Sequence, residues 1–572
     1  MKPMNKNRKP EILSPAGSLE AAYAAVAGGA DAIYIGGRML NARMNAKNFG
    51  DEALCECIKH CHENGVKVYV TLNTAVLDRE LKSAVDYADM LYALGVDALI
   101  VSDTGLASAF KNRYPEMELH ASTQASGHNA DCAKALAELG FCRMVCAREL
   151  SEADIKTLCE HSPIEIEQFV HGAMCVSQSG QCLASAMMGG RSGNRGVCAQ
   201  PCRMSYNGSH PLSLKDMCLA PHAKTLFRSG VSSLKIEGRM KSPSYVYGVT
   251  KIYRHIIDEG RNASESEIKE LAAIFSRGGF TDGYYTERIS SDMNGVRAEA
   301  DISASRAVKT DFKKIERSLP KITVSERTLS EPFAPPKAAK RVGKSGKPIC
   351  TARFSSPNQI KDTGFFSHVY LPIDKYEEGY ADGIVMPPSV FPRDEKRFRE
   401  LLERAVKLGA EHALITHIGQ VKLALEYGLI PHGDFRLNVF NTLTAKYCTS
   451  IGMRDVILSP ELTLPQMRDI DAPKATIAYG KVPIMLLTKP LEARSLKDTR
   501  GARFEVISEY GFDILLNSVP FYMADKQKSL DENGIRGRHF IFTTESGREC
   551  LSVISAFKNG EKADYPIRRL SL

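Results

Sequence analysis

Residues 165–206 read EIEQFVHGAMCVSQSGQCLASAMMGGRSGNRGVCAQPCRMSY, a short β-branched run followed by a long loop with four cysteines. The cysteines are Cys175, Cys182, Cys198 and Cys202, spaced CxxxxxxC and then CxxxC. Their neighbours are glycines, serines and arginines, whereas a core cysteine would have apolar neighbours. The stretch therefore predicts a strand that leads into a site for a soft metal.

The β-branched run in this stretch is one of eight in the first half of the chain. Helical patterns with one apolar stripe, such as SLEAAYAAVAGG and ADCAKALAELG, lie between them. This alternation predicts an α/β fold, a TIM-like (β/α)8 barrel. A doubly wound sheet is the alternative, but residues 15–18, PAGS, are not its GxGxxG fingerprint. The runs are residues 11–14, 32–36, 66–73, 98–102, 119–123, 143–147, 164–170 and 233–237.

Polar side chains collect where these runs end. Asn73 ends the third run, Gln124 follows the fifth, His171 ends the seventh, and Glu237 and Arg239 end the eighth. The active site of such a barrel lies at the carboxyl ends of its strands, so we expect these residues and the cysteine loop on one rim. The alternative is that each serves only the fold, with Glu237 paired to Arg239 and His171 capping its strand.

The four cysteines could hold zinc, an iron–sulfur cluster or no metal. Structural zinc usually takes tight CxxC pairs, whereas six residues separate Cys175 from Cys182 and the loop is long and rich in glycine. This spacing favours a bulkier [4Fe–4S] cluster. Cys218, in LSLKDMCLAP, could replace Cys202 as the fourth ligand, and the spacing leaves both assignments open.

Composition indicates a globular protein of more than one domain. The chain has 572 residues, of which 43% are hydrophobic and 25% charged. Its net charge of +8 permits a nucleic-acid partner without requiring one. No apolar segment follows the basic start MKPMNKNRKPEIL, and no later run is apolar enough to span a bilayer. We therefore expect a cytoplasmic protein without a membrane partner.

The second half repeats part of the first. LGVDALIVSD at 94–103 is similar to LGAEHALITHIG at 408–419, and residues 139–155 are similar to residues 451–467. The counterpart of FVHGAMC is IAYGKVPIM at 477–485, which lacks the histidine and the cysteines. We therefore expect a second, degenerate βα barrel-like domain that holds no cluster. Its expected roles are packing against the first barrel, shaping the cleft or presenting surface to RNA.

These patterns divide the chain into four parts. EPFAPPKAAKRVGKSGK at 331–347 is rich in proline, lysine and glycine, which is typical of a solvated basic linker. The expected parts are a disordered tail at 1–10, the barrel with its cysteine loop at 11–290, a connecting segment with the basic linker at 291–347, and the second barrel-like domain at 348–572.

Several long motifs resemble the peptidase U32 family, whose members are also called collagenase-like. They are HGAMCVSQSGQCLAS, RSGNRGVCAQPCRMSY and SLKIEGRMKSPSYV, together with EILSPAG and ADAIYIGG, and they extend from Glu11 to Tyr285. The better understood members of this family resemble one another as iron–sulfur proteins of oxygen-independent hydroxylation. One branch acts on tRNA uridine, one on ribosomal-RNA cytidine and one on the ubiquinone ring. LNARMN at 40–45 and RSGNRG are most similar to the ribosomal-RNA 5-hydroxycytidine branch. That branch lacks a cysteine at the position of Cys218, whereas the ubiquinone branch has a ligand near it, so the resemblance favours Cys202.

The resemblance implies an RNA hydroxylase that carries a [4Fe–4S] cluster and modifies a 23S rRNA cytidine or a tRNA uridine. It implies prephenate as the hydroxyl donor and allows an electron-transfer partner. We expect Glu237, His171 and Arg239 to be catalytic, because an acid or base and a cation suit this chemistry. Paired arginines suit the two carboxylates of prephenate. The expected substrate-binding residues are Arg43, Asn73, Gln124, Arg191, Asn194 and Arg195.

Two other classes of function are weighed against this one. A peptidase is disfavoured because the sequence has no HExxH helix and no GxSxG elbow, although Cys175 with His171 is a conceivable nucleophile pair. A non-catalytic iron–sulfur scaffold or assembly factor would have the same cysteines. Only a functional measurement separates that class from the enzyme.

Overall fold

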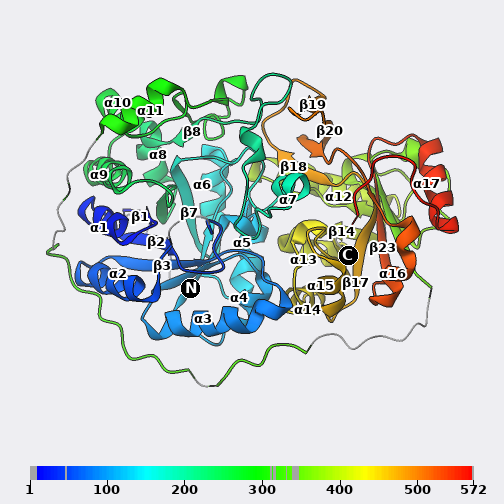
Figure 1. The fold of residues 1–572 in the computed structure, drawn as a ribbon, viewed down its shortest axis with the longest axis horizontal. Helices are drawn as coiled ribbons and strands as arrows, with labels where there is room; N and C mark the ends of the chain where they lie inside the picture. Colours follow the sequence, from blue (N-terminus) through cyan, green and yellow to red (C-terminus); the bar gives the residue numbers. More distant parts are fainter. Residues whose placement is uncertain are drawn as a thin grey trace.

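The computed structural model describes residues 9–44, 48–308, 312, 317–329, 331–337 and 347–569, and Figure 1 shows two barrels side by side. Barrel 1 is drawn in blue to green, and barrel 2 in yellow to red. Residues 1–8 of the predicted tail and residues 338–346 of the predicted linker lie outside the described residues, as does Asn45 of the LNARMN motif.

Barrel 1 is a closed ring of eight parallel strands. Its strands are β1 (Glu11–Ala16), β2 (Ala32–Gly36), β3 (Lys67–Leu72), β4 (Ala98–Val101), β5 (Glu118–Ala121), β6 (Arg143–Val145), β7 (Glu165–Gly172) and β9 (Ser233–Ile236). Strands β1 to β7 pair in chain order, and the ring closes where β9 pairs with both β7 and β1. The predicted TIM-like barrel is confirmed, and the open doubly wound sheet is excluded.

Helices cover the outside of barrel 1, and polar residues cap several of their amino termini. Ser18 and Asn129 each accept a hydrogen bond from the backbone N–H three residues further on. The helices are α1 (Leu19–Ala27), α2 (Asp51–Glu63), α3 (Leu81–Ala93), α4 (Thr104–Phe110), α5 (Ala130–Glu138), α6 (Glu152–His161), α7 (Ala184–Gly189), α8 (Ala223–Arg228), α9 (Pro243–Glu259), α10 (Glu265–Ile274) and α11 (Glu299–Ala307).

The cysteine loop leaves barrel 1 at a sharp turn after β7. Gly172 has φ +103°, and a Cβ there would lie 2.6 Å from the carbonyl oxygen of Glu237, so only glycine fits without strain. The chain returns through β8 (Asp216–Cys218), which pairs antiparallel with β7, and β10 (Phe280–Thr281) pairs with β8. The loop therefore starts and ends at the carboxyl-terminal end of the barrel.

Barrel 2 is also closed, so the predicted second barrel is confirmed and is complete in its strands. The strands are β11 (Ile349–Phe354), β12 (His368–Pro372), β13 (Gly383–Val385), β14 (His412–Ile415), β15 (Ile430–Gly433), β16 (Val456–Ile457), β17 (Lys474–Gly480) and β23 (Gly537–Phe542). Its helices are α12 (Glu395–Lys407), α13 (Val421–Glu426), α14 (Thr442–Ser450), α15 (Leu464–Asp469), α16 (Gln527–Glu532) and α17 (Gly547–Asn559).

The sequence repeat places equivalent segments on equivalent strands. Residues 94–103 and 408–419 contain β4 and β14, the fourth strand of each barrel. The seventh strands, β7 and β17, both end in a glycine with positive φ, Gly172 and Gly480. Each then pairs antiparallel with a strand of the segment inserted after it, β8 in barrel 1 and β22 (Phe521–Tyr522) in barrel 2.

The segment inserted after β17 forms an antiparallel sheet of β18 (Pro483–Leu487), β21 (Phe512–Leu516), β20 (Arg503–Glu509) and β19 (Ser495–Lys497). Its first strand contacts the cysteine loop, because Gln178 N–H donates to Leu486 O at 2.9 Å and Leu183 N–H donates to Ile484 O at 2.8 Å. Glu509 of this sheet forms a buried ion pair with Arg353 of β11 at 2.7 Å. The sheet therefore joins barrel 2 to the cysteine loop.

The two barrels meet through reciprocal contacts. A Cβ on Gly105, after β4, would lie 2.3 Å from Thr444 N at the start of α14. A Cβ on Gly419, after β14, would lie 2.7 Å from Cys132 N at the start of α5. The glycine after the fourth strand of each barrel thus contacts the start of the helix that follows the fifth strand of the other barrel. These two equivalent contacts give the interface an approximate twofold symmetry.

The connection between the barrels contacts barrel 1. Ile322 N–H donates to His62 O at 2.9 Å, and Arg327 donates from Nη1 to Val96 O at 2.8 Å. These carbonyls lie just before β3 and β4, at the amino-terminal end of barrel 1. Residues 317–329 therefore run along the end opposite the cysteine loop.

Candidate active site

A cavity of about 140 Å³ lies at the carboxyl-terminal end of barrel 1, where barrels of this kind have their active sites. Cys175, Cys182, Cys198 and Cys202 all line it, and so does Met485 of β18. The other predicted site residues in its wall are Arg43, Asn73, Gln124, Asn194, Glu237 and Arg239.

The thiols in this cavity are close enough to influence one another. Burial raises the pKa of Cys202 to about 12, and the nearby Cys175 and Cys198 thiols add to the rise. Burial also raises the pKa of Cys182, and the other three thiols contribute again. The bare Cys182 and Cys202 thiols therefore stay protonated at neutral pH, whereas a bound metal would hold its sulfur ligands as thiolates. Four converging sulfur donors fit a soft metal or an iron–sulfur cluster.

Cys218 lies elsewhere. It is on β8, paired with His171 of β7, and it does not line the cavity. Burial raises its pKa to about 11, and its side chain interacts with Tyr253, not with the other cysteines. The structure thus groups Cys202, and not Cys218, with the other three thiols.

Glu237 follows β9 and faces three guanidinium groups. Arg43 donates from Nη2 to Glu237 Oε1 at 3.2 Å, and only 14% of the Glu237 side chain is exposed. Burial alone would raise the pKa of Glu237, but Arg43, Arg148 and Arg239 together hold the pKa below its ordinary value. Glu237 is therefore ionised at neutral pH and can accept a proton.

Arg239 and Arg148 are held by hydroxyl groups. Arg239 donates from Nη1 to Thr71 Oγ1 at 2.9 Å, and Arg148 donates from Nη1 to Ser179 Oγ at 2.9 Å. Burial lowers the pKa of Arg239 to about 10, which leaves it charged at neutral pH. Three guanidinium groups around one carboxylate give the cavity an excess of positive charge that favours an anionic ligand.

His171 ends β7 at the carboxyl-terminal rim, as predicted, but its side chain does not line the cavity. The pairing of β7 with β9 shifts register between Phe169 and His171, and such a bulge re-aims the next side chain. The imidazole packs against aromatic rings, with centroids 5.3 Å from Phe280 and 5.7 Å from Tyr253. Burial lowers its pKa to about 3. Within the described residues, no hydrogen bond joins His171 to Cys175, so the conceivable nucleophile pair is not formed.

Two of the predicted substrate-binding arginines stabilise the cysteine loop instead. Arg195 forms a forked ion pair with Glu80 at 2.7 and 2.8 Å. Arg191 is exposed and donates from Nε to Val197 O at 3.0 Å. Neither lines the cavity.

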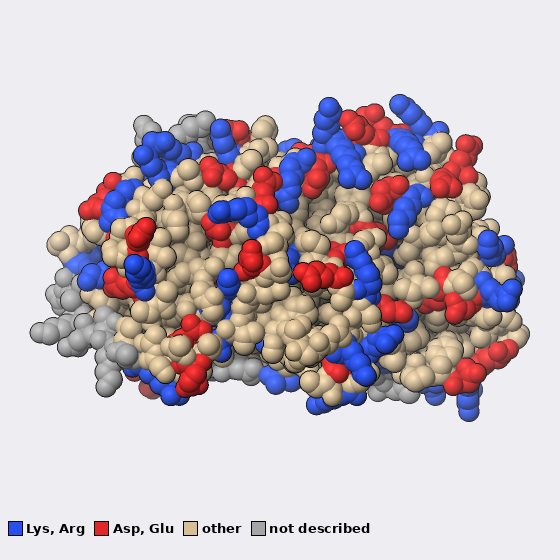
Figure 2. Space-filling view, turned by 90° about the horizontal axis from the view of Figure 1, so that it is seen from above, with Lys and Arg blue, Asp and Glu red and all other residues tan. Residues whose placement is uncertain are grey.

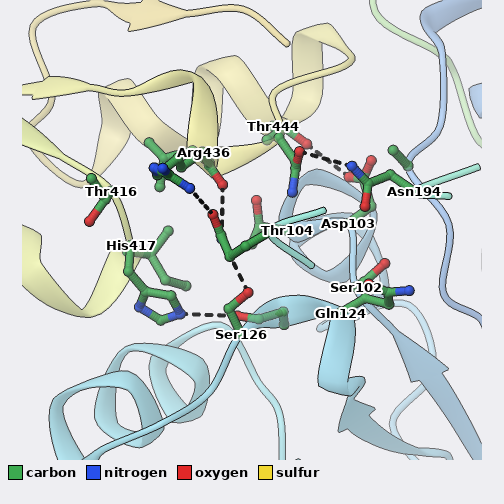
Figure 3. Close-up of a pocket in the computed structure, with 16 residues that line it drawn as sticks. Ser102, Asp103, Thr104, Gln124, Ser126, Asn194, Thr416, His417, Arg436 and Thr444 are labelled. Atoms are coloured by element: carbon green, nitrogen blue, oxygen red, sulfur yellow. Dashed lines mark hydrogen bonds between the residues drawn. The ribbon is translucent and has the colours of Figure 1, made fainter. Parts of the chain in front are cut away.

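Gln124 and Asn194 also line a second cavity of about 60 Å³ between the barrels, shown in Figure 3. Arg436 and Thr444 of barrel 2 contribute to its opposite wall. Asn73 lines only the larger cavity. The two shared amides thus stand where the cysteine cavity meets the interface between barrels.

Tyr34, Lys235 and Met485 are among the residues of the cavity wall that the sequence did not single out. Lys235 donates from Nζ to Glu167 Oε1 at 2.7 Å and lies 4.6 Å above the Tyr34 ring. Alternation along SLKIE places Lys235 on the same face as Glu237, which is a signal that could have predicted it. Met485 lies on β18 of the sheet inserted after β17, and no local pattern predicts its approach.

The face shown in Figure 2 has no comparable concentration of charge. On the face in Figure 2, lysine and arginine side chains alternate with aspartate and glutamate, and neither sign forms a continuous patch. The three guanidinium groups of the cavity are therefore the more specific cationic feature.

No helix in the part of the chain that the structure describes is both long and apolar enough to cross a membrane.

One family model and several known proteins match this chain in sequence. The model of peptidase family U32 matches residues 17–295. The chain is 42% identical over 259 residues to 23S rRNA 5-hydroxycytidine synthase of Escherichia coli, and the match spans 43% of this chain but only 39% of that protein. It is 35% identical over 360 residues to tRNA hydroxylation protein P of Helicobacter pylori, covering 58% of this chain and 84% of the relative. A collagenase of Porphyromonas gingivalis is 33% identical over 306 residues, with 48% and 73% covered. By these matches and its cysteine motifs, the chain belongs to peptidase family U32.

Proposed function

We propose that this chain is an RNA-modifying enzyme that hydroxylates a pyrimidine base, a 23S rRNA cytidine or a tRNA uridine, without molecular oxygen. The observation that carries the proposal is the convergence of four cysteines, three guanidinium groups and Glu237 on one cavity at the active end of barrel 1. Relatives named for hydroxylation of each kind of RNA support the substrate class. An RNA substrate also implies a cytoplasmic location.

The proposed cofactor is a [4Fe–4S] cluster held by Cys175, Cys182, Cys198 and Cys202. One tetrahedral zinc ion would bring thiolate sulfurs to about 3.8 Å from one another. Among the described residues, no three of these cysteines have sulfur atoms that all lie within 4.8 Å of one another. This wider spacing supports a cluster over zinc. When bound, a cluster would supply a Lewis-acidic or redox-active metal centre.

The residues of the chain itself would bind the donor and move a proton. Arg239 and Arg148 carry the positive charge that suits an anionic hydroxyl donor such as prephenate, which has two carboxylates. Glu237, held ionised by its arginines, would accept a proton. Asn73 and Gln124 would offer amide groups to the base. An electron-transfer partner belongs to the same proposal.

Nucleoside mass spectrometry of rRNA and tRNA tests this function. A deletion strain should lack a 5-hydroxypyrimidine, and the intact chain should restore it. The Glu237→Gln variant should restore at least about 100-fold less, because a proton acceptor is lost. The matched Glu532→Gln variant, at an exposed position on α16, should restore it fully. Unchanged nucleosides in the deletion strain would instead favour a non-catalytic iron–sulfur scaffold.

A further inference from the structure

Three histidines gather at the amino-terminal end of barrel 2. His368 begins β12, His412 begins β14, and His432 lies on β15; one ring nitrogen of each lies within 4.8 Å of the others. Gly383 begins the strand between β12 and β14, and a Cβ there would lie 3.1 Å from His412 Cβ. Because this strand contributes no side chain at that level, the His368 and His412 rings meet, with centroids 3.9 Å apart.

Two carboxylates orient two of these rings. His368 Nδ1 lies 2.8 Å from Asp382 Oδ2, and His432 Nδ1 lies 3.0 Å from Asp455 Oδ1. An ionised carboxylate only accepts hydrogen bonds, so both Nδ1 atoms donate and both Nε2 atoms keep their lone pairs. A histidine whose outer N–H is bound by a carboxylate is the usual arrangement around a protein-bound metal.

The third ring completes the arrangement. His412 Nδ1 lies 3.0 Å from His432 Nε2, and His412 Nε2 faces Asp382 Oδ2 at 3.9 Å. With metal bound at Nδ1, the Nε2–H of His412 would point at that carboxylate. Ring centroids of His432 lie 5.2 Å from His412 and 5.4 Å from His368. Imidazoles on one tetrahedral ion have centroids about 5 Å apart, so only the closer His368–His412 pair would need to open.

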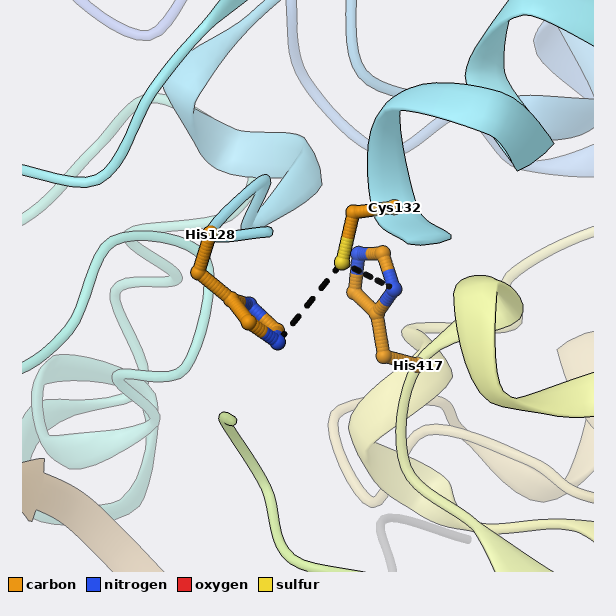
Figure 4. A group of neighbouring side chains, drawn as sticks. All are labelled: His128, Cys132 and His417. Atoms are coloured by element: carbon orange, nitrogen blue, oxygen red, sulfur yellow. Dashed lines mark hydrogen bonds between the residues drawn. The ribbon is translucent and has the colours of Figure 1, made fainter. Parts of the chain in front are cut away.

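A second cluster has similar residues but different bonding. At the barrel interface, Cys132 Sγ lies 3.1 Å from His417 Nδ1 and 3.6 Å from His128 Nε2 (Figure 4). The single lone pair of His417 Nδ1 already accepts the backbone N–H of Gly419 at 3.1 Å, because His417 caps that turn. This cluster is explained by hydrogen bonding alone.

We propose that His368, His412 and His432 bind a divalent transition-metal ion, with zinc as the reference ion and water in the remaining position. Imidazole is a preferred ligand for such ions, and three protein ligands with one open position are a common zinc arrangement. The charges of Asp382 and Asp455 would offset the two positive charges of the ion. A cavity of about 250 Å³ lined by His432 and Asp455 provides a route for it.

Cobalt titration of the full-length protein, purified without oxygen and freed of loose metal with a chelator, tests the proposal. We expect one equivalent of Co²⁺ to give the visible bands of a tetrahedral site without thiolate charge-transfer absorption, and Zn²⁺ to displace it. The His412→Gln, His432→Gln double variant should bind Co²⁺ at least about 100-fold more weakly. The matched His128→Gln variant should bind it unchanged.

Three other outcomes would refute the proposed metal site. Absence of saturable Co²⁺ binding, unchanged affinity in the double variant, or bands accompanied by thiolate absorption would each do so. If the double variant does not fold, Asp382→Asn keeps all three histidines and should weaken binding by about tenfold, because an outer partner of the ligands is lost; unchanged affinity there would also refute the proposal. None of these results depends on RNA hydroxylation.

Discussion

Glu461 of barrel 2 stabilises the cysteine loop of barrel 1. Its carboxylate accepts a hydrogen bond from Ser192 Oγ at 2.5 Å and lies 3.4 Å from Asn194 Nδ2. Burial raises the pKa of Glu461 to about 7, and its partners Ser192, Arg195 and Asn194 only partly offset that rise. A single residue thus links the pH dependence of stability to the contact between the barrels.

We expect Glu461→Gln to flatten this dependence. A carboxyl whose pKa is raised on folding favours the folded state fully below its unfolded pKa, and that contribution is lost as pH rises through the folded pKa. The free energy of unfolding of the original protein, relative to the variant, should therefore fall between about pH 4.5 and 7, by about 3 kcal/mol. Denaturant titrations at several pH values measure it. Parallel pH profiles for the two proteins would contradict the prediction, and exposed Glu532→Gln is the control.

The identity of the fourth cysteine ligand, Cys202 or Cys218, can also be tested at single residues. If the proposed cluster is bound, Cys202→Ser should lose most of the iron and the broad visible absorption, because one of its four proposed ligands is gone. Cys218→Ser should retain both, since Cys218 lies on β8 outside the cavity wall. Iron analysis of anaerobically purified variants measures the difference. The opposite result would identify Cys218 as the fourth ligand.

At the scale of elements, short β-branched runs that alternate with helical patterns were sufficient to predict every strand of barrel 1. They also predicted that Glu237 and Arg239 share one end of the barrel with the cysteine loop. His171 ends its strand as predicted, but its side chain does not enter the cavity, because alternation assumes regular pairing and the register shift after Phe169 breaks it. Arg191 and Arg195 had the right charge, but partners such as Glu80 are visible only after folding.

The glycines that end β7 and β17 should be intolerant of a side chain. Gly172→Ala would press a methyl group against Glu237 O, and Gly480→Ala would place one 2.1 Å from Ile541 O, both at positive φ. We expect each to lower the free energy of unfolding by about 2–4 kcal/mol. Gly260→Ala, at φ +65° with nothing within 4 Å of the added Cβ, should cost only about 1 kcal/mol. If chemical denaturation shows the same loss of unfolding free energy in all three variants, the contacts with Glu237 O and Ile541 O do not cause the effect.

At the scale of the whole molecule, the two barrels are coupled through buried polar contacts. Asn441 donates from Nδ2 to Val76 O at 2.8 Å and to Asp103 Oδ2 at 2.7 Å, and it caps α14. Asn129 caps α5 and donates to Val390 O at 2.9 Å. The internal repeat predicted a second barrel from sequence, but its approach to the first depends on these contacts across the chain, which no local pattern encodes.

Asn441→Ala should therefore weaken the association of the barrels. It removes a helix cap and one donor to the buried Asp103 carboxylate, which together should cost about 2–4 kcal/mol. We expect the denaturant midpoint to fall and the transition to separate into two steps. Asn533→Ala, which removes a hydrogen bond to Ser529 O inside barrel 2, should leave a single transition. A single transition in Asn441→Ala would show that the barrels unfold as one unit without this contact.

The reciprocal Gly105–Thr444 and Gly419–Cys132 contacts are those of an isologous dimer, in which the same patch of each subunit meets the other. Here one polypeptide contains both subunits, so the pair cannot dissociate and its halves are free to diverge. The half with the thiols would keep the proposed chemistry, while its partner supplies Met485 to the cavity wall. If the proposed function holds for this family, substrate selectivity could then evolve on the partner half without altering a single cysteine.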